Sequence, residues 1–287
     1  MVVISLKGGL GNQLFQYAMA YDFARKKNHE LYIDNSTFEM KNAYRDNGLE
    51  DFNFPLLKAN RRSIQRLKNP YGIFSQFYRV AKRKITKDYN VGWKPELIET
   101  KKNDVFFDGY FQSYKYFEDS AEDLQLFFTL KDQFQKEVKP IEEEINHCNS
   151  VSLHVRRGDY VTNKKVERFF NICNHDYYTR AIDMMRSLIG PCKLFVFSDD
   201  PVWVRENMSF LGIDFKIVSS NVLNPSQEMY LMSRCKHNII PNSTFAWWGA
   251  YMNPNKNKVV ICPSLWSKDS QDFKYLIPDE WTRLDVV

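Results

Sequence analysis

Short apolar runs alternate with helix-forming stretches through the second half of the chain, and this alternation restricts the folds open to it. The runs are predicted to be buried strands at Val151–Val155, Leu194–Phe197, Phe215–Val218, Asn238–Ile240 and Val259–Cys262. Helices are predicted between them at about Asp176–Leu188, after Pro201, at about Ser226–Arg234 and at about Ser243–Met252. Strands and helices that alternate in this way predict a parallel sheet covered on both faces, an architecture that binds nucleotides.

The amino-terminal half opens with a unit of the same kind. A predicted strand at Val2–Leu6 leads through a glycine-rich loop into a helix at about Asn12–Lys27 and a second strand at Leu31–Asp34. A chain of 287 residues is long enough for about two domains. We therefore predict an α/β protein with domains at 1–149 and 150–287, whose two halves face each other across a ligand-binding cleft.

One segment, 58–87, holds a quarter of the positively charged residues. It contains ten of the 40 Lys and Arg residues and no Asp or Glu. Without these ten, 30 basic residues stand against 35 acidic ones, so the net charge of +5 combines a basic segment with a body of charge −5. Three interpretations stay open: a solvated face, contact with an anionic surface such as phospholipid headgroups, or nucleic-acid binding with Phe74, Phe77 and Tyr78 as stacking residues.

The sequence shows no pattern for membrane insertion, secretion, disulfides or zinc. No apolar run approaches the roughly 18 to 20 residues that cross a bilayer, and the apolar start is too short for a signal peptide. The five cysteines are widely spaced without a C-x-x-C pair, and the five histidines lack the spacing of metal ligands. We therefore expect a cytoplasmic protein.

The first chemical cluster follows the predicted strand Val151–Val155. His154 and Arg156 share one face of it, because side chains alternate along a strand, and they stand at its carboxyl end, where parallel sheets bind ligands. Arginine suits phosphate because its planar guanidinium donates two parallel hydrogen bonds and stays charged. For Arg157 and Asp159 a simpler interpretation stays open, namely a local ion pair that holds the loop.

The second cluster is Asn242-Ser243-Thr244, which ends a predicted strand and opens a predicted helix. Free backbone N–H groups, two hydroxyls and the positive end of the helix dipole meet there, and together they form a ready anion site. Taken alone, these residues fit an ordinary helix N-cap better. With an arginine pair on an adjacent parallel strand, they favour a bound diphosphate.

Two further loops carry polar groups. Ser198-Asp199-Asp200 ends a predicted strand, where the carboxylates could hold a metal, act as a base or cap the next helix, and capping is favoured. The chain has no Asp-x-Asp pair, so arginine and a helix end would have to hold a diphosphate in place of a metal. The loop 8–13 lacks the spacing of a dinucleotide-binding motif, but its glycines admit a ligand to the backbone, and Asn12 and Gln13 offer amide hydrogen bonds.

These clusters resemble the motifs of the α-1,2-fucosyltransferases of bacterial surface-glycan synthesis. The likeness rests on Gly-Gly-Leu-Gly-Asn-Gln-Leu-Phe-Gln-Tyr-Ala at 8–18, His-Val-Arg-Arg-Gly-Asp-Tyr at 154–160, Phe-Ser-Asp-Asp at 197–200, and Lys-His-Asn-Ile-Ile-Pro-Asn-Ser-Thr-Phe-Ala-Trp-Trp-Gly-Ala at 236–250. The motifs occur in the family's order along most of the chain. The region 38–103, which we predict to be irregular, matches no motif of the family.

The resemblance implies a GT-B fold, two Rossmann-like domains facing across a cleft, with 1–149 on the acceptor side and 150–287 binding GDP-β-L-fucose. It implies inverting transfer of L-fucose to the 2-hydroxyl of a galactose in a surface glycan such as an O antigen, without a metal or other cofactor. The galactose-terminated acceptor could be lipid-linked, in which case the basic segment would touch an anionic membrane peripherally; nucleic acid is not expected. The alternative is a non-catalytic module that binds a sugar nucleotide or glycan.

The resemblance also assigns roles to residues. The diphosphate would be held by Arg156 together with Ser243 and Thr244. Guanine would be recognised by His154 and Glu228, and Asn12 would approach the fucose. The full donor-binding set is Gly11, Asn12, His154, Arg156, Arg157, Glu228, Asn242, Ser243 and Thr244.

The residues with a catalytic role would be Arg156, Asn12 and Asp159. Arg156 and the helix end would stabilise the charge that grows on the departing GDP. For the acceptor proton three alternatives stay open: Asp159 as the base, an acidic side chain of the amino-terminal half as the base, or no base at all if departure of GDP is far advanced.

Overall fold

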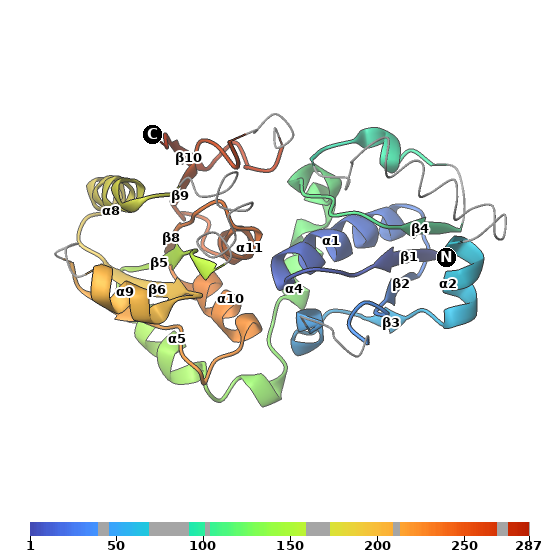
Figure 1. Ribbon diagram of the computed structural model, residues 1–287, viewed down its shortest axis with the longest axis horizontal. Coiled ribbons are helices and arrows are strands. Elements are labelled where there is room, and N and C mark those ends of the chain that lie inside the picture. The colour runs from blue at the N-terminus through green and yellow to red at the C-terminus, as the bar shows by residue number, and fades with distance from the viewer. Residues whose placement is uncertain are drawn as a thin grey trace. The chain divides into compact units, whose positions relative to one another are not determined.

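A computed structural model describes residues 1–39, 46–68, 92–100, 104–158, 173–208, 213–268 and 275–286. These residues form two compact units, each with its own parallel sheet (Figure 1). Unit 1 comprises Met1–Glu50, Phe54–Phe127 and 275–277. Unit 2 comprises Asp51–Asn53, 128–268 and 278–286, apart from the gaps just given.

The sheet of unit 1 has the strand order β3-β2-β1-β4, and all neighbouring strands are parallel. The strands are β1 (Val2–Ser5), β2 (Leu31–Asp34), β3 (Leu57–Lys58) and β4 (Val105–Phe107). Helix α1 (Leu10–Lys26) follows β1 and packs on β1 and β2, with most of its side chains buried. The two predicted strands and the predicted helix at the start of the chain are confirmed.

The region 38–103 is not wholly irregular, and that prediction is wrong for helix α2 (Arg61–Lys68). Its first turn is capped by Asn60, whose side-chain oxygen accepts a hydrogen bond from the backbone N–H of Ser63 at 2.9 Å. The helix packs on β4, but none of its residues is buried. The amphipathic pattern is present, but in this short helix it rests on two large apolar residues, Ile64 and Leu67, among basic and polar ones.

The sheet of unit 2 has the order β10-β9-β8-β5-β6-β7, again with parallel neighbours. The strands are β5 (Ser150–Val155), β6 (Lys193–Ser198), β7 (Phe215–Ile217), β8 (His237–Ile239), β9 (Val260–Pro263) and β10 (Thr282–Leu284). The chain builds outward from β5 through β6 to β7, then returns to the other side of β5 with β8. Strand order therefore reverses between β5 and β8, the position at which open parallel sheets bind ligands.

Helices connect the strands of unit 2 as the sequence predicts. They are α8 (His175–Ile189), α9 (Pro201–Asn207), α10 (Pro225–Arg234) and α11 (Thr244–Tyr251). Asn174, Asp200 and Asn224 each accept a hydrogen bond from a backbone N–H in the first turn of the helix that follows. The preference for capping at Asp200 is thus confirmed.

Short elements complete the described ranges. One α-helix is α4 (Ala121–Phe127). The 3-10 helices span Gly48–Asp51, Pro95–Leu97, Tyr114–Tyr116, Glu118–Ser120 and Asp132–Phe134.

Unit 2 begins earlier in the chain than the boundary at 149/150 that the sequence suggests. Helix α5 (Lys139–Asn146) accounts for the difference, because it packs on α10. Glu142 accepts hydrogen bonds from the Tyr230 hydroxyl at 3.0 Å and from Arg234 Nε at 2.8 Å. The sequence pattern shows that a helix is present, but not which sheet an acidic, half-exposed helix joins.

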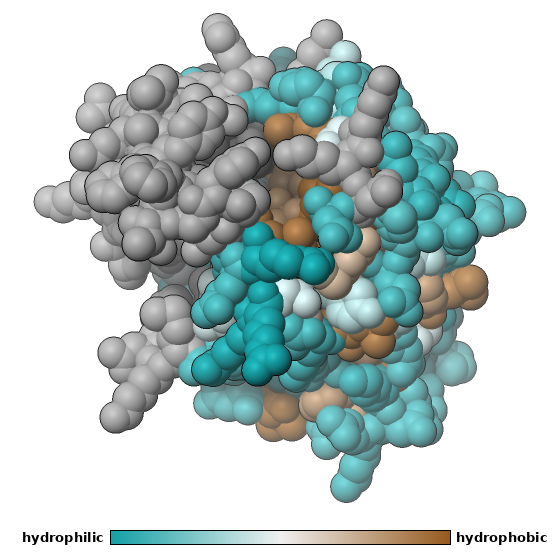
Figure 2. Space-filling model, turned by 90° about the vertical axis from the view of Figure 1, so that its right-hand side faces the viewer, coloured by the Kyte–Doolittle hydropathy of each residue, from teal (hydrophilic) through white to brown (hydrophobic). Residues whose placement is uncertain are grey.

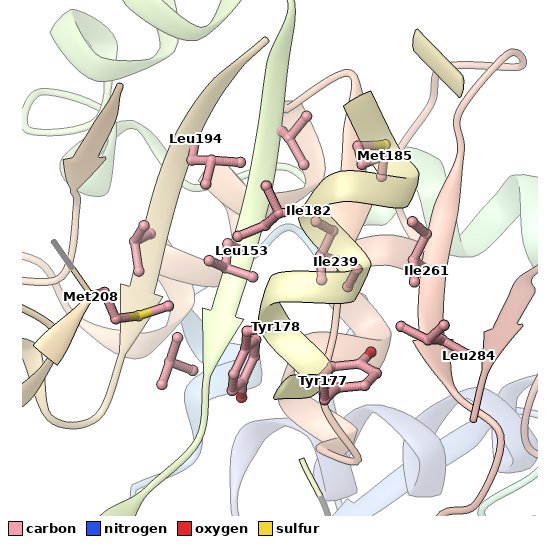
Figure 3. Packing of buried hydrophobic residues seen from close by; sticks show 14 of the residues in the cluster. Leu153, Tyr177, Tyr178, Ile182, Met185, Leu194, Met208, Ile239, Ile261 and Leu284 are labelled. Atoms are coloured by element: carbon pink, nitrogen blue, oxygen red, sulfur yellow. The ribbon is translucent and has the colours of Figure 1, made fainter. Parts of the chain in front are cut away.

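The core of unit 2 lies between α8 and the sheet (Figure 3). Leu153 and Ile239 from the sheet pack with Ile182 of α8, and all three are at most 2% exposed. The buried Tyr177 hydroxyl donates a hydrogen bond to the carbonyl of Ile240 at 2.6 Å, which ties α8 to the segment that leaves β8. This packing fixes the carboxyl ends of β5 and β8 relative to each other.

Helices α10 and α11 approach closely at Gly249. A Cβ atom built there would lie 2.9 Å from Cβ of Met232, and that atom belongs to a helix and cannot swing aside. Nearby, Trp247 and Trp248 are fully buried, as the sequence predicts for core residues. None of the helices in the described ranges is long and apolar enough to span a bilayer.

We expect Gly249→Ala to destabilise unit 2 by about 1 to 3 kcal/mol, because the added methyl must push the two helices apart. Thermal and urea unfolding of the full chain measure the effect. Leu188→Ala is the control, since this side chain is 56% exposed and its loss should cost under about 0.5 kcal/mol. Equal stability of Gly249→Ala and the wild type would show that the helices can separate without cost.

Candidate functional site

The predicted donor residues of unit 2 gather where the strand order reverses. The loop after β5 carries Arg156 and Arg157, and the segment after β8 carries Asn242, Ser243 and Thr244. The ends of β6 and β7 and the first turn of α10 supply Asp199, Ser219 and Glu228. The site is thus assembled from the carboxyl ends of four strands.

Asp199 holds the arginine loop. Its Oδ2 atom lies 2.7 Å from Arg156 Nη1, and its Oδ1 atom accepts a hydrogen bond from the backbone N–H of Arg157 at 2.8 Å. The carboxylate lies so close to Gly158 that a Cβ atom there would come within 2.5 Å of Oδ2. One carboxylate therefore fixes both the side chain and the backbone at the end of β5, which the sequence did not indicate.

Arg157 has structural partners on α9. Its Nε atom lies 3.3 Å from Oδ2 of Asp200, and its guanidinium carbon lies 3.8 Å from the ring centroid of Trp203. Asp200 also accepts the Trp203 backbone N–H at 3.0 Å. Arg157 thus forms an ion pair with Asp200. The local pair of Arg157 with Asp159 stays a prediction, because Asp159 lies outside the described residues.

His154 is 3% exposed, and its Nδ1 atom has no hydrogen-bond partner among the described residues. Burial, with a smaller contribution from the nearby charge of Arg156, lowers the pKa of His154 to about 3, so the imidazole is neutral near pH 7. Its ring centroid lies 5.5 Å from that of Phe245. A buried polar atom without a partner is costly, so His154 is suited to receive a hydrogen bond from, or donate one to, a bound ligand.

Glu228 lies in the first turn of α10 and accepts a hydrogen bond from the Ser219 hydroxyl at 2.9 Å. Burial, with the charge of Asp199 adding to it, raises the pKa of Glu228 from its ordinary value of 4.5 to about 7. A carboxylate with this pKa gains from ligand groups that donate hydrogen bonds to it. A role for Glu228 in binding is predicted only from the family resemblance.

The start of α11 fits an anion better than a simple N-cap. Ser243 occupies the N-cap position, yet its side chain makes no capping hydrogen bond to the helix. Asn242, by contrast, points inward: it is 2% exposed, and its Nδ2 atom donates to the carbonyl of Trp266 at 2.9 Å. Ser243 and Thr244 therefore suit the predicted diphosphate role, whereas Asn242 holds the loop in shape.

The other predicted residues belong to unit 1. Gly11 and Asn12 lie in the first turn of α1, and Asn12 Oδ1 accepts a hydrogen bond from Gln112 Nε2 at 2.8 Å. Gln13 is buried and structural: it donates to the carbonyls of Gly8 and Asp46, both at 2.9 Å. The contact of Gln112 with Asn12 spans 100 positions and had no signal in the sequence.

Within the described part of the chain, no group of three His, Cys, Asp or Glu side chains is arranged to hold a metal ion. The cationic groups that face the reversal point are Arg156 and the amino-terminal end of α11. Together with the buried, neutral His154 they make this edge of the sheet suited to an anionic ligand, as the sequence predicts.

A parallel α/β unit with such a site is the nucleotide-binding half of many glycosyltransferases, and comparison with solved structures agrees. The NodZ α-1,6-fucosyltransferase soaked with GDP-fucose shares the fold, with a TM-score of 0.53 and 20% identity, covering 88% of this chain and 92% of that one. The predicted α/β, GT-B fold class is confirmed.

The chain belongs to glycosyl transferase family 11, whose sequence pattern matches residues 1–284. It is 31% identical, over an alignment of 312 positions, to the Escherichia coli O-antigen biosynthesis glycosyltransferase WbnK, covering 97% of this chain and 99% of WbnK. It is 29% identical, over an alignment of 294 positions, to the Escherichia coli α-1,2-colitosyltransferase, covering 99% of both chains. The predicted family and the prediction of a glycosyltransferase are confirmed.

We expect Glu228→Gln to stabilise the protein at pH 8 but not near pH 5. The native carboxyl binds its proton more tightly than the unfolded one, so its contribution to stability falls as pH rises from about 4.5 to about 7. Glutamine keeps an oxygen for Ser219 and removes this titration, a gain of up to about 3 kcal/mol above pH 7. Urea unfolding at both pH values measures it.

The exposed Glu206 on α9 supplies the matched control. Glu206→Gln should change stability little and equally at both pH values. A gain from Glu228→Gln that is the same at pH 5 and pH 8 would contradict the proposed titration.

Proposed function

We propose that this glycosyltransferase moves L-fucose from GDP-β-L-fucose to the 2-hydroxyl of a galactose, with inversion at the fucosyl carbon. The observation that carries the proposal is the Arg156–Asp199 pair beside the open start of α11, at the point where strand order reverses. Family membership and the relatives' roles in O-antigen synthesis and α-1,2 transfer support it. Unit 2 would bind the donor, and unit 1 would bind the acceptor.

The positive groups of unit 2 match the charge that the reaction creates. As the bond from fucose to phosphate breaks, GDP takes the electron pair and its phosphate becomes more negative. Arg156 and the backbone N–H groups at Thr244 would stabilise that charge where it develops, and electrostatic stabilisation is usually the largest contribution to catalysis. Arg156 is already oriented by Asp199, so it need not reorganise when charge appears. We therefore propose transfer without a metal or other cofactor.

His154 and Glu228 would recognise the guanine base. Guanine presents two neighbouring N–H donors on one edge, and an ionised carboxylate accepts two such hydrogen bonds. Binding would favour the ionised form of Glu228, whose pKa of about 7 leaves it only partly ionised at neutral pH in the absence of ligand. The unpartnered Nδ1 of His154 would gain a hydrogen bond from the ligand.

We expect Arg156→Ala to reduce transfer at least about 100-fold and to weaken GDP binding, since a preorganised charge at the leaving group is lost. Mass spectrometry of a β-galactoside incubated with GDP-fucose measures transfer, and calorimetry measures GDP binding. Arg205→Ala on the exposed side of α9 is the control and should behave as the wild type. Addition of a chelator should leave the wild-type rate unchanged.

The same assay separates the alternatives. GDP-fucose should be used more efficiently than its 3-deoxy analogue, the GDP-colitose that a colitosyltransferase would use; the reverse order would move the donor assignment to colitose. Binding of GDP-fucose without any gain of mass on a panel of galactosides would favour a non-catalytic binding module. Full activity of Arg156→Ala would contradict the site assignment.

We further propose that the acceptor is a lipid-linked glycan and that the enzyme works in the cytoplasm, in peripheral contact with an anionic membrane. The described part of the basic segment supports the contact. Lys58, Arg66 and Lys68 pair with carboxylates of unit 1, whereas Arg61 and Arg62 are exposed and have no acidic partner among the described residues. Figure 2 views the side of the molecule on which α2 lies, and most of the coloured surface on this side is hydrophilic.

We expect the protein to float with phosphatidylglycerol-containing vesicles at low salt and to be released at high salt, because exposed charges are screened beyond about 10 Å at 0.1 M ionic strength. The double change Arg61→Glu with Arg62→Glu should abolish flotation without affecting transfer to a soluble galactoside. Vesicles of phosphatidylcholine alone are the control. Salt-independent flotation, or none, would reject the membrane contact, and binding to DNA in its place would support the nucleic-acid interpretation.

A further inference from the structure

A second polar cluster lies in unit 1, at the carboxyl ends of β1 and β4. These strands are parallel neighbours, paired from Val2 with Val105 to Ile4 with Phe107 (Figure 1). The segments that leave them therefore emerge side by side. Lys7 follows β1 and Asp108 follows β4, at the edge where parallel sheets bind ligands.

Lys7 and Asp108 form a partly exposed ion pair with an aromatic ring beside it. Lys7 Nζ lies 2.5 Å from Asp108 Oδ1, and the two side chains are 24% and 33% exposed. The same ammonium lies 5.2 Å from the ring centroid of Tyr110. That ring also borders Gly8, where a Cβ atom would lie 3.6 Å from Tyr110 Cε1 and 3.1 Å from Asn12 Nδ2. The carboxylate, the aromatic ring and the Asn12 amide thus share one small region.

Buried side chains hold this cluster in place. Gln16 is fully buried, and its side-chain amide both accepts the Lys7 backbone N–H at 2.9 Å and donates to the Lys7 carbonyl at 3.2 Å. Gln112 is 9% exposed, and its Nε2 atom donates a hydrogen bond to Oδ1 of Asn12. This contact orients the Asn12 amide, so that its Nδ2 group can donate to a ligand. The two buried glutamines therefore hold Lys7 and Asn12 in place by hydrogen bonds.

The composition of the cluster fits a sugar. Carbohydrates are held by planar polar groups that hydrogen-bond to hydroxyls and by aromatic rings that cover their apolar faces. Asp108, Asn12 and Tyr110 supply these groups on a rigid edge. The ammonium of Lys7, 2.5 Å from Oδ1, holds the carboxylate of Asp108 in place at this edge.

We propose that this cluster is the acceptor subsite and that Asp108 is the base that takes the proton of the galactose 2-hydroxyl. The inference rests on the proposed fucosyl transfer and goes beyond it by naming the group that removes the proton. In the step, the O–H bond breaks and its proton passes to the Asp108 carboxylate, while the oxygen forms a bond to the fucosyl carbon. The bond from that carbon to phosphate breaks, and GDP leaves with the electron pair.

Asp108→Asn tests the assignment. A general base contributes about 100- to 10,000-fold, so kcat for a β-galactoside should fall at least about 100-fold, with KM for the acceptor changed by less than about threefold. GDP affinity should be unchanged, since the residues proposed to hold the diphosphate and the guanine lie in unit 2. Asp108→Glu should recover part of the rate. The control is Asp104→Asn, which removes a carboxylate paired with the terminal amine just before β4 and should leave kcat unchanged.

Lys7→Gln gives a test that leaves the carboxylate in place, in case Asp108→Asn unfolds. Without the ammonium, the Asp108 carboxylate loses the ion pair that orients it, so kcat should fall while GDP affinity stays unchanged. Transfer within about fivefold of wild type by a folded Asp108→Asn, or a wild-type kcat in Lys7→Gln, overturns the assignment of the base. Loss of GDP binding in Asp108→Asn overturns it as well. If the wild type makes no fucosylated product, the proposed function fails first.

Discussion

The contact between Asp199 and Arg156 is the constraint on which the proposed donor site depends. A partly exposed ion pair adds little to stability by itself, but here one carboxylate also holds the backbone of Arg157 and leaves no room for a Cβ at position 158. The result is a guanidinium with a fixed direction at the end of β5. An arginine that swings freely would have to be ordered during the reaction, and that cost would subtract from the stabilisation of the leaving group.

The same carboxylate links two parts of the site. Asp199 attracts Arg156 and also contributes to the raised pKa of Glu228, after the larger effect of burial. A diphosphate bound to Arg156 would bring more negative charge toward Glu228, whereas the guanine N–H donors would favour the ionised carboxylate. A complete guanine nucleotide can satisfy both groups, and an isolated phosphate can satisfy only Arg156. The charges of Arg156, Asp199 and Glu228 thus favour a ligand that carries both a diphosphate and a base with two hydrogen-bond donors.

Local patterns predicted the strands of unit 2, the placement of His154 and Arg156 at the end of one strand, and the cap at Asp200. They could not predict contacts between side chains far apart in the chain, such as Asp199 with Arg156 or Gln112 with Asn12. Periodicity shows which face a residue occupies but not what it meets there. For that reason only the structure shows that Asn242 turns inward, that α5 belongs to unit 2 and that the exposed helix α2 is present.

The proposed reaction needs opposite charges: cations where GDP leaves and a carboxylate where the acceptor proton is lost. In the proposed assignment, each of these groups has a counterion within its own unit. Arg156 is paired with Asp199 in unit 2, and Asp108 is paired with Lys7 in unit 1. Because each ion pair restricts the side chain that would react, neither group would have to be ordered during the reaction.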